Sequence, residues 1–334
     1  MAKKPKDTDY IFLTAVIRAR EPRLLTRESA ERLLSSASPQ DVIKQLEELG
    51  WDVSGATPAT LDAALAAMRR QEFADLEAVC PCKGLVQVFR LRYDYHNLKV
   101  LLKSETTSHT REEAMALLSD MGRFPADRLA RDYYADDLRD YPAVFSAAAA
   151  EAKDSLARTG DPQLADVLLD RACYSEFISM AQATGSRFLQ DYAALTADSA
   201  NLRITVRTRR MGRDDAFLER MLLAGGTLSP KKLLEELEKE TPLSEIFPAS
   251  LKEAAAAGEA ALAGGRLTDF EKHCDNALAD YLEGDRFIGF DERVVVRYLC
   301  SLENQISAVR IILAGVSAGL SPDQIRERLR DPYV

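Results

Sequence analysis

Residues that serve catalysis or bind metals are scarce in this sequence. Only three histidines, His96, His109 and His273, occur in 334 residues. The five cysteines are odd in number and scattered, which favours reduced thiols over a disulfide framework. They are Cys80, Cys82, Cys173, Cys274 and Cys300. Because the pair Cys80 and Cys82 lacks the spacing of a zinc knuckle and has no second pair, we expect no metal site and no cofactor.

Several sequence signals of other protein classes are also missing. The sequence contains no P-loop and no G-x-S-x-G motif, which argues against ATP hydrolysis by this chain and against that hydrolase chemistry. We find no run of about 20 apolar residues, and predict no membrane span. The polar segment Met1–Asp9 is not followed by the apolar core of a signal peptide.

The formal net charge of −9 argues against nucleic acid as a partner, because a nucleic-acid binder must neutralise phosphates. One local exception is the basic stretch Arg203–Arg213, which holds five arginines. We interpret this stretch either as a solvated helix end or turn, or as a surface that binds an acidic partner.

Helical signals dominate what is present. Glycine and proline are few, at 16 and 13 residues. A cap residue followed by proline, which favours a helix start, recurs along the chain. These dipeptides are Ser38-Pro39, Thr57-Pro58, Asp161-Pro162, Ser229-Pro230 and Ser321-Pro322. Strand-like alternation is scarce, so we predict an all-α protein.

Helical periodicity supports this prediction. Two apolar stripes repeat at spacings of three and four residues, the period of one helix face. They are Val88, Leu91, Tyr95, Leu98 and Leu102, and then Val295, Leu299, Leu302, Ile306, Val309 and Leu313.

An internal repeat has the pattern D-x-x-N-L-[KR]-x-x-[LV]-[KR]. Its first copy holds Asp94, Asn97, Lys99 and Lys103, and its second holds Asp198, Asn201, Arg203 and Arg207. A fainter third copy aligns Asn304 with Asn97 and ends at Arg310. The repeat predicts three helical units, at residues 8–108, 109–212 and 213–334. We interpret the pattern as the packing signature of a duplicated unit, or else as a face that meets a partner.

One motif points to an enzyme. Asp136, Asp137 and Asp140 form a D-D-x-x-D pattern, which in all-α prenyl synthases holds Mg²⁺ and a diphosphate. A second facing motif is absent, and the segment Asp132–Asp140 reads more simply as an acidic, solvated helix. Two alternatives therefore stay open, a Mg²⁺-dependent prenyl-type enzyme and an unrelated all-α scaffold.

The segment from Arg92 to Lys103 closely resembles the signature of the C subunit of bacterial and archaeal V/A-type ATPases, whose eukaryotic relative is called the d subunit. The resemblance extends over nearly the whole chain. It includes the opening residues Tyr10, Arg18, Arg20, Glu21, Leu24 and Leu25, the second repeat, and an ending that runs from Glu303 to Tyr333 and Val334.

This resemblance implies a non-catalytic, funnel-like protein of three similar helical units around a pseudo-threefold axis. It implies a rotor subunit of the central stalk, placed between the shaft subunits D and F and the membrane ring of proteolipid subunits. Such a protein would lie on the cytoplasmic side of the membrane and be held there by its protein partners. The charged residues of the repeat, Lys99, Lys103, Arg203 and Arg207, are then candidate contact residues.

Overall fold

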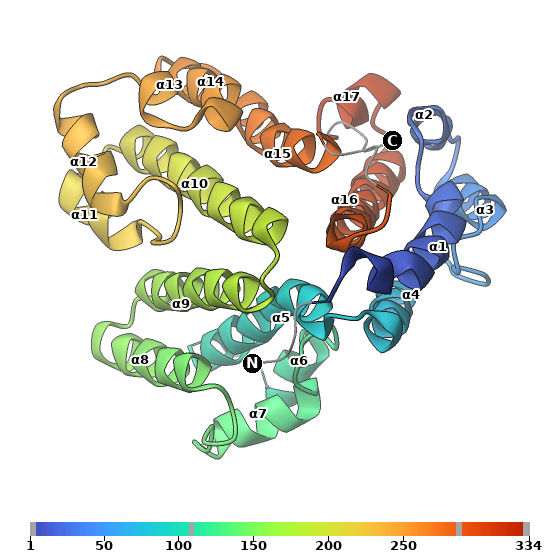
Figure 1. Ribbon diagram of the computed structural model, residues 1–334, viewed down its shortest axis with the longest axis horizontal. Helices are drawn as coiled ribbons and strands as arrows, with labels where there is room; N and C mark the ends of the chain where they lie inside the picture. The colour runs from blue at the N-terminus through green and yellow to red at the C-terminus, as the bar shows by residue number, and fades with distance from the viewer. Residues whose placement is uncertain (1–4, 107–109, 285–288, 330–334) are drawn as a thin grey trace. The chain divides into compact units, whose positions relative to one another are not determined.

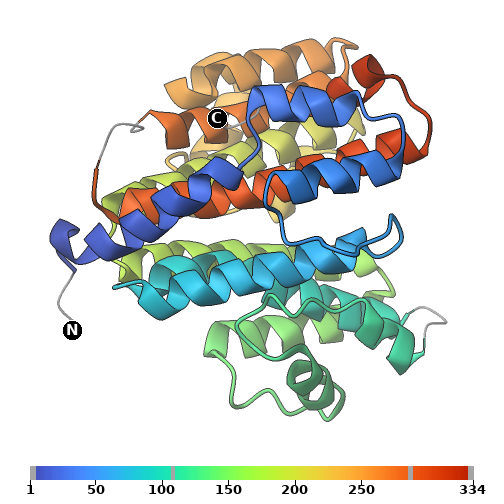
Figure 2. The same cartoon turned by 90° about the vertical axis from the view of Figure 1, so that its right-hand side faces the viewer.

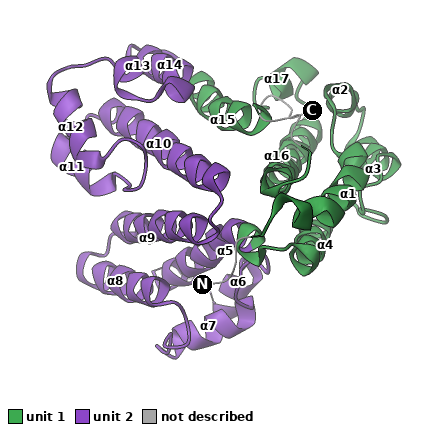
Figure 3. Ribbon diagram, viewed as in Figure 1, with its two compact units in different colours: residues 1–86, 266–334 green, residues 87–265 purple. Residues whose placement is uncertain are grey.

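The computed structural model describes residues 5–106, 110–284 and 289–329, and within these ranges it is built from helices joined by turns, without strands (Figure 1). The all-α prediction is confirmed. The chain divides into two compact units, coloured separately in Figure 3. Unit 1 comprises Met1–Val86 and Arg266–Val334, and unit 2 comprises Gln87–Gly265. The three predicted repeat units stay a prediction, since a compact unit need not coincide with a sequence repeat.

Unit 1 takes its helices from both ends of the chain. Three short 3-10 helices occur in the structure, two of them here, η1 (Asp7–Tyr10) and η2 (Glu21–Arg23). The α-helices of unit 1 are α1 (Ile11–Arg20), α2 (Arg27–Leu34), α3 (Pro39–Glu48), α4 (Leu61–Val79), α15 (Leu267–Glu283), α16 (Glu292–Ser317) and α17 (Pro322–Arg326). Helix α5 (Lys83–Ser104) begins in unit 1 and continues into unit 2.

Unit 2 is continuous in sequence. Besides most of α5 and η3 (Ala249–Leu251), it contains α6 (Arg111–Ala116), α7 (Ala126–Tyr134), α8 (Ala143–Thr159), α9 (Pro162–Ala183), α10 (Arg187–Arg210), α11 (Asp215–Met221), α12 (Pro230–Glu238), α13 (Leu243–Ile246) and α14 (Lys252–Leu262).

Four of the five predicted helix starts are correct. Ser38, Asp161, Ser229 and Ser321 each cap a helix by accepting a hydrogen bond from a backbone N–H of its first turn. The fifth is misplaced, because α4 begins only at Leu61. Residues before it form a turn in which the hydroxyl of Thr60 accepts from the N–H of Thr57 at 2.8 Å.

Helix α16 forms the centre of unit 1. It packs against α1, α2, α3, α4 and α17, and Figure 2 shows it running beside α1. Its predicted stripe is buried from Val295 to Val309, and Leu313 is half-buried. Burying each such side chain stabilises the fold by roughly 1.5–3 kcal/mol. By length and composition α16 could also cross a bilayer, contrary to our expectation, but half of its most apolar stretch is buried inside the protein, as in a core helix.

Unit 2 has an aromatic core between α5, α7, α8 and α9. All five residues of the stripe predicted on α5 are buried. Tyr95 from that stripe meets Phe145 edge to face at a centroid distance of 5.3 Å, and Tyr141 stacks on the same ring at 5.7 Å. This packing fixes α5, and with it the first copy of the repeated motif.

Candidate functional site

The asparagine of the first repeat holds both backbone groups of one residue by two hydrogen bonds, a contact that we call the grip. Asn97 lies on α5 and is fully buried. Its side-chain oxygen accepts from the N–H of Ser119 at 2.7 Å, and its side-chain nitrogen donates to the carbonyl oxygen of Ser119 at 2.9 Å. Because one amide satisfies both backbone groups of one residue, it fixes the start of the loop that precedes α7.

The aspartate of the first repeat holds the end of the same loop. The carboxylate of Asp94 accepts from the backbone N–H groups of Arg123 at 2.8 Å and Phe124 at 3.4 Å. It also accepts from Nε of Arg123 at 2.6 Å. A side chain at Gly122 would place its Cβ only 2.4 Å from Asp94 Oδ1, so the carboxylate reaches the loop only because glycine stands there.

The second repeat makes the same contacts at the same sequence offsets. Asn201 accepts from the N–H of Leu223 at 2.8 Å and donates to its carbonyl oxygen at 2.9 Å, 22 residues later as in the first copy. Asp198 accepts from the N–H groups of Thr227 at 2.9 Å and Leu228 at 3.2 Å. A Cβ at Gly226 would approach Asp198 Oδ1 to 2.0 Å.

These repeated carboxylate and amide groups lie inside the protein. Asp94, Asn97, Asp198 and Asn201 are each at most 1% exposed. Their hydrogen bonds are made within unit 2, so they position loops of this chain and present no surface to another molecule.

Unit 1 contains a related contact, made by Gln305 on α16. Its side-chain oxygen accepts from the N–H of Leu25 at 2.7 Å, and its nitrogen donates to the carbonyl oxygen of Leu25 at 3.4 Å. The step from Asn201 to Gln305 is 305 − 201 = 104, equal to the step from Asn97, 201 − 97 = 104. Gln305 stands one residue after Asn304, which the sequence pattern aligned with Asn97, and its longer side chain makes the same pair of hydrogen bonds as the two asparagines.

The surroundings of the Gln305 contact differ from those of Asn97 and Asn201. In the first two copies the helix cap stands six positions after the residue that the asparagine holds, Pro125 after Ser119 and Ser229 after Leu223. In unit 1 the cap Thr26 follows Leu25 directly. There is no intervening loop for a carboxylate to hold, and the position 104 residues after Asp198 is the buried Leu302.

The predicted cationic contact residues of the first repeat pair with α9. Nζ of Lys99 lies 2.5 Å from Asp170 Oδ1, and Nζ of Lys103 lies 2.7 Å from Asp166 Oδ2. Both ion pairs are partly exposed, so each contributes little to stability.

The cations of the other copies lie in different surroundings. Arg203 donates to Oγ of Ser199 at 3.0 Å within α10, and together with Arg207 it lines a cavity of about 330 Å³. Arg310 on α16 pairs at 2.7 Å with Asp62 on α4, at the surface of unit 1.

The basic stretch Arg203–Arg213 covers the last turns of α10 and the turn after it. Positively charged side chains at the C-terminal end of a helix interact favourably with the negative end of the helix dipole. Arg210 donates to the carbonyl oxygens of Ala261 at 3.3 Å and Gly265 at 2.8 Å, and so caps the end of α14. This part of the stretch is a helix end with internal contacts.

Sequence reasoning missed a buried polar network beside Asp94. Glu176 on α9 accepts from Nη1 of Arg123 at 2.8 Å and from the hydroxyl of Tyr95 at 2.9 Å. Burial raises the pKa of Asp94 to about 6, against the opposing effect of Arg123. One signal was available, because Glu176 follows Leu169 by seven residues on the inward face of α9.

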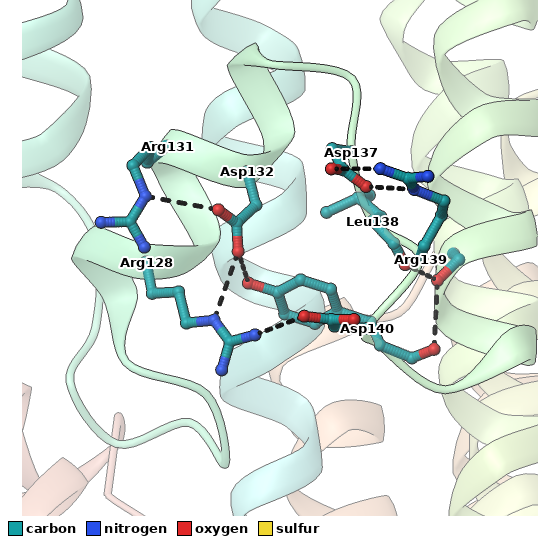
Figure 4. A network of polar contacts seen from close by, with 9 residues as sticks. Arg128, Arg131, Asp132, Asp137, Leu138, Arg139 and Asp140 are labelled. Atoms are coloured by element: carbon teal, nitrogen blue, oxygen red, sulfur yellow. Dashed lines mark hydrogen bonds and ion pairs between the residues drawn. The ribbon is translucent and has the colours of Figure 1, made fainter.

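The D-D-x-x-D segment is a loop, which corrects our reading of it as a helix. Helix α7 ends at Tyr134, and Asp136 follows with a left-handed φ of 56°. Figure 4 shows that Asp137 and Asp140 pair with separate arginines, at 2.8 Å with Arg139 and 3.0 Å with Arg128. Asp136 turns to Lys153 at 3.2 Å. The three carboxylates therefore do not converge on one cation.

The cysteines and histidines are not gathered into a metal centre within the described ranges, where no cluster of three possible ligands is found. None of the five cysteines, all of which lie in the described ranges, forms a disulfide. Burial raises the pKa of the Cys80 thiol to about 12, which disfavours the thiolate form that binds metals and reacts. His109, Tyr333 and Val334 lie outside the described residues.

The fold is therefore an all-α chain whose repeated polar motif holds loops of the chain itself. The family profile described as "ATP synthase (C/AC39) subunit" matches residues 13–328, nearly the whole chain. The chain therefore belongs to the C/AC39 family, and is the C subunit of a V/A-type ATPase, a non-catalytic part of its stalk. Membership in this family excludes the unrelated scaffold and the prenyl-type enzyme that the sequence left open.

Individual relatives are similar in sequence to this chain over most of their length. The C subunit of the V-type sodium ATPase of Enterococcus hirae is 21% identical, with 97% of this chain and 99% of the relative covered. The C subunit of the A-type ATP synthase of Haloferax volcanii is 23% identical, with 95% and 96% covered. The C subunit of the V-type ATP synthase of Thermus thermophilus is 27% identical over 63% of this chain and 66% of the relative.

Proposed function

We propose that this chain is a rotor subunit of the central stalk, which joins the shaft subunits D and F to the membrane ring of proteolipid subunits. It transmits torque for ion transport and leaves ATP chemistry to other subunits. It lies on the cytoplasmic side of the membrane, held there by protein partners. The observation that carries the proposal is the family match from residue 13 to residue 328.

We also propose three similar helical units in a pseudo-threefold, funnel-like arrangement. Its support is the side-chain grip on a backbone peptide, which recurs at steps of 104 residues through Asn97, Asn201 and Gln305. Three similar units offer repeated contacts to a ring of identical subunits.

The internal contacts of the chain are of a kind expected in a subunit that transmits torque. Each grip joins a long helix to a segment outside that helix, and a hydrogen-bonded buried polar group specifies one geometry. In unit 1 the ion pair between Arg69 and Glu303, at 3.2 Å, also links α4 to α16 away from solvent. Breaking such a buried pair costs about 3–5 kcal/mol, so the linkage resists being pulled apart.

In our proposal the partner contacts belong to the partly or fully exposed charges of the repeat, which are Lys99, Lys103, Arg203, Arg207 and Arg310. Charge reversal at Arg203 with Arg207 weakens assembly if these residues meet a partner. If the variant instead loses helicity or melts early, these two residues serve the fold of this chain.

The test is co-migration on size exclusion with purified shaft subunits D and F from the same organism, repeated with the isolated ring. We expect a stable complex with each, and a three-part complex when all are mixed. A well-folded sample that binds neither component would overturn the coupling role and leave only family membership.

A further inference from the structure

Two thiols stand two positions apart in the turn between α4 and α5, in unit 1. Helix α4 ends at Val79, Cys80 follows it as the helix cap, and α5 begins at Lys83. Between Cys80 and Cys82 lies Pro81, where the chain bends sharply. A pair of thiols this close in sequence can act together, which the three scattered cysteines cannot do with a neighbour in sequence.

The side chain of Cys80 points toward Cys82. Its Sγ donates to the backbone carbonyl oxygen of Cys82 at 3.1 Å. Two residues of fully extended chain span at most about 7 Å, so a bend between them brings their Cα atoms into the range of about 4.4–6.8 Å that a disulfide needs. The two sulfurs can therefore meet through side-chain rotation and a small adjustment of the turn.

The two thiols differ in their access to solvent. Cys80 is 5% exposed, whereas Cys82 is partly exposed. An attacking thiol must reach its oxidant, so Cys82 is the group that meets one in solution. Burial raises the pKa of Cys80 to about 12, which makes it a poor first nucleophile. Its closeness to Cys82 favours it in a second, intramolecular step.

We propose that Cys80 and Cys82 form a reversible redox site, at which a low-molecular-weight disulfide such as glutathione disulfide converts the two thiols into one disulfide. The Cys82 thiolate attacks one sulfur of glutathione disulfide, which gives a mixed disulfide and releases one glutathione. The Cys80 thiol then loses its proton and attacks the Cys82 sulfur, which closes the internal disulfide and releases the second glutathione. Two protein thiols are oxidised, and one glutathione disulfide is reduced to two thiols.

Oxidation acts on the packing around Tyr10, which ends η1 just before α1 and is 3% exposed. Burial raises the pKa of Tyr10, and Cys82, Cys80, Glu292 and Asp291 add to the effect, so these groups lie close to the ring. Closing the disulfide ends the hydrogen bond of Cys80 and moves a buried side chain of this cluster. Because a ring closed across two residues restricts the unfolded chain only slightly, little stability is gained in return. The start of α1 is therefore held less firmly in the oxidised protein.

Mass spectrometry of the full chain tests the site. The folded protein is incubated with glutathione disulfide, unfolded and alkylated, and trypsin then yields the peptide Gln71–Lys83, which contains both cysteines. We expect this peptide to become unalkylated and two hydrogens lighter than its free-thiol form, and dithiothreitol to restore two alkylated thiols. A peptide that stays doubly alkylated, or that carries only glutathione, overturns the proposal.

Two variants and a matched control separate the roles of the thiols. Cys80→Ser keeps a hydrogen-bond donor but removes the second thiol, so we expect Cys82 to accumulate as the mixed disulfide with glutathione. Cys82→Ser removes the attacking thiol and should leave Cys80 fully alkylatable. Cys173→Ser removes another partly exposed thiol, and the disulfide should form within twofold of the wild-type rate. An unmodified Cys82 in folded Cys80→Ser, or in Cys80→Ala if the buried serine prevents folding, contradicts the assigned order of attack.

Hydrogen exchange shows whether the disulfide changes the fold. We expect backbone amides of α1 to exchange at least fivefold faster in the oxidised wild type, and at an unchanged rate in Cys82→Ser treated in the same way. Unchanged exchange in a fully oxidised wild type overturns the effect on α1. Both measurements use the chain by itself, so their outcome is independent of the proposed coupling role.

Discussion

The side chain of Gln305 holds the backbone of Leu25, 280 residues earlier in the chain, by accepting from its N–H at 2.7 Å and donating to its carbonyl oxygen. Both residues are almost completely buried. The contact ties the first segment of unit 1 to the last long helix, and it uses the same pair of hydrogen bonds that Asn97 and Asn201 make in unit 2.

Removing this amide should destabilise the protein. Gln305→Leu leaves the N–H and carbonyl of Leu25 buried without partners, and each such group costs about 1–3 kcal/mol. We expect a loss of about 2–4 kcal/mol in the free energy of unfolding, measured by urea denaturation. Asn304→Ala is the control, since Asn304 is half-buried beside the grip, and should cost under about 1 kcal/mol. Equal losses in both variants would contradict a specific role for the Gln305 amide.

Two glycines should resist substitution because of the carboxylates they face. Gly122→Ala and Gly226→Ala each push a Cβ into Oδ1 of Asp94 or Asp198, at 2.4 and 2.0 Å. The carboxylate must move, which breaks its bonds to the loop, so we expect each change to cost about 2 kcal/mol or more. Gly289→Ala, which would have no atom within 4 Å of its Cβ, is the neutral control. The melting temperatures of the three variants, each compared with that of the wild type, test this prediction.

Stability should depend on pH through Asp94. Its pKa is about 6 in the folded protein, against 3.8 as the ordinary value. The folded state therefore binds the proton of Asp94 more tightly than the unfolded state does. The resulting contribution to the free energy of unfolding is present below pH 4 and is lost as pH rises through 6. Between pH 5.5 and 8 the wild type should lose ~1 kcal/mol more than Asp94→Asn, measured from urea midpoints. Parallel curves for the two proteins would show that this carboxyl does not titrate there.

The acidic loop should be indifferent to magnesium. Asp136, Asp137 and Asp140 each pair with a different cation at the surface, so Mg²⁺ would have to break these pairs without gaining a converging ligand set. We expect no change in melting temperature with millimolar Mg²⁺ and a cost within about 0.5 kcal/mol for Asp140→Ala. A rise in melting temperature with Mg²⁺ that Asp140→Ala abolishes would restore the metal-site reading.

Many helix starts and buried helix faces could be predicted from local signals in the sequence. Side chains such as Ser38 and Asp161 start helices through contacts within three residues, so their effect is readable from the sequence alone. The stripe of α16 is readable for the same reason, because burial follows the helical period. The start of α4 was missed because no side chain caps it.

Contacts between distant segments could not be predicted in this way. Nothing near Gln305 in sequence indicates that its partner is Leu25, and the sequence pattern pointed to the neighbouring Asn304 because the first two copies use asparagine. The network of Arg123 with Glu176 also joins separate segments, which lie 53 residues apart in the chain. The acidic segment was misread because a left-handed residue, Asp136, ends the helix, and composition does not reveal backbone conformation.

The grip of α16 on Leu25 has a consequence for how a cell makes the protein. A ribosome releases Leu25 early, but Gln305 leaves it only after 280 further residues have been added. Until then the amide that holds the first segment does not exist, whereas the continuous unit 2 has already been synthesised in full. The opening helices must therefore wait, partly exposed, for the end of translation, and it is in this interval that nascent-chain chaperones would have their substrate.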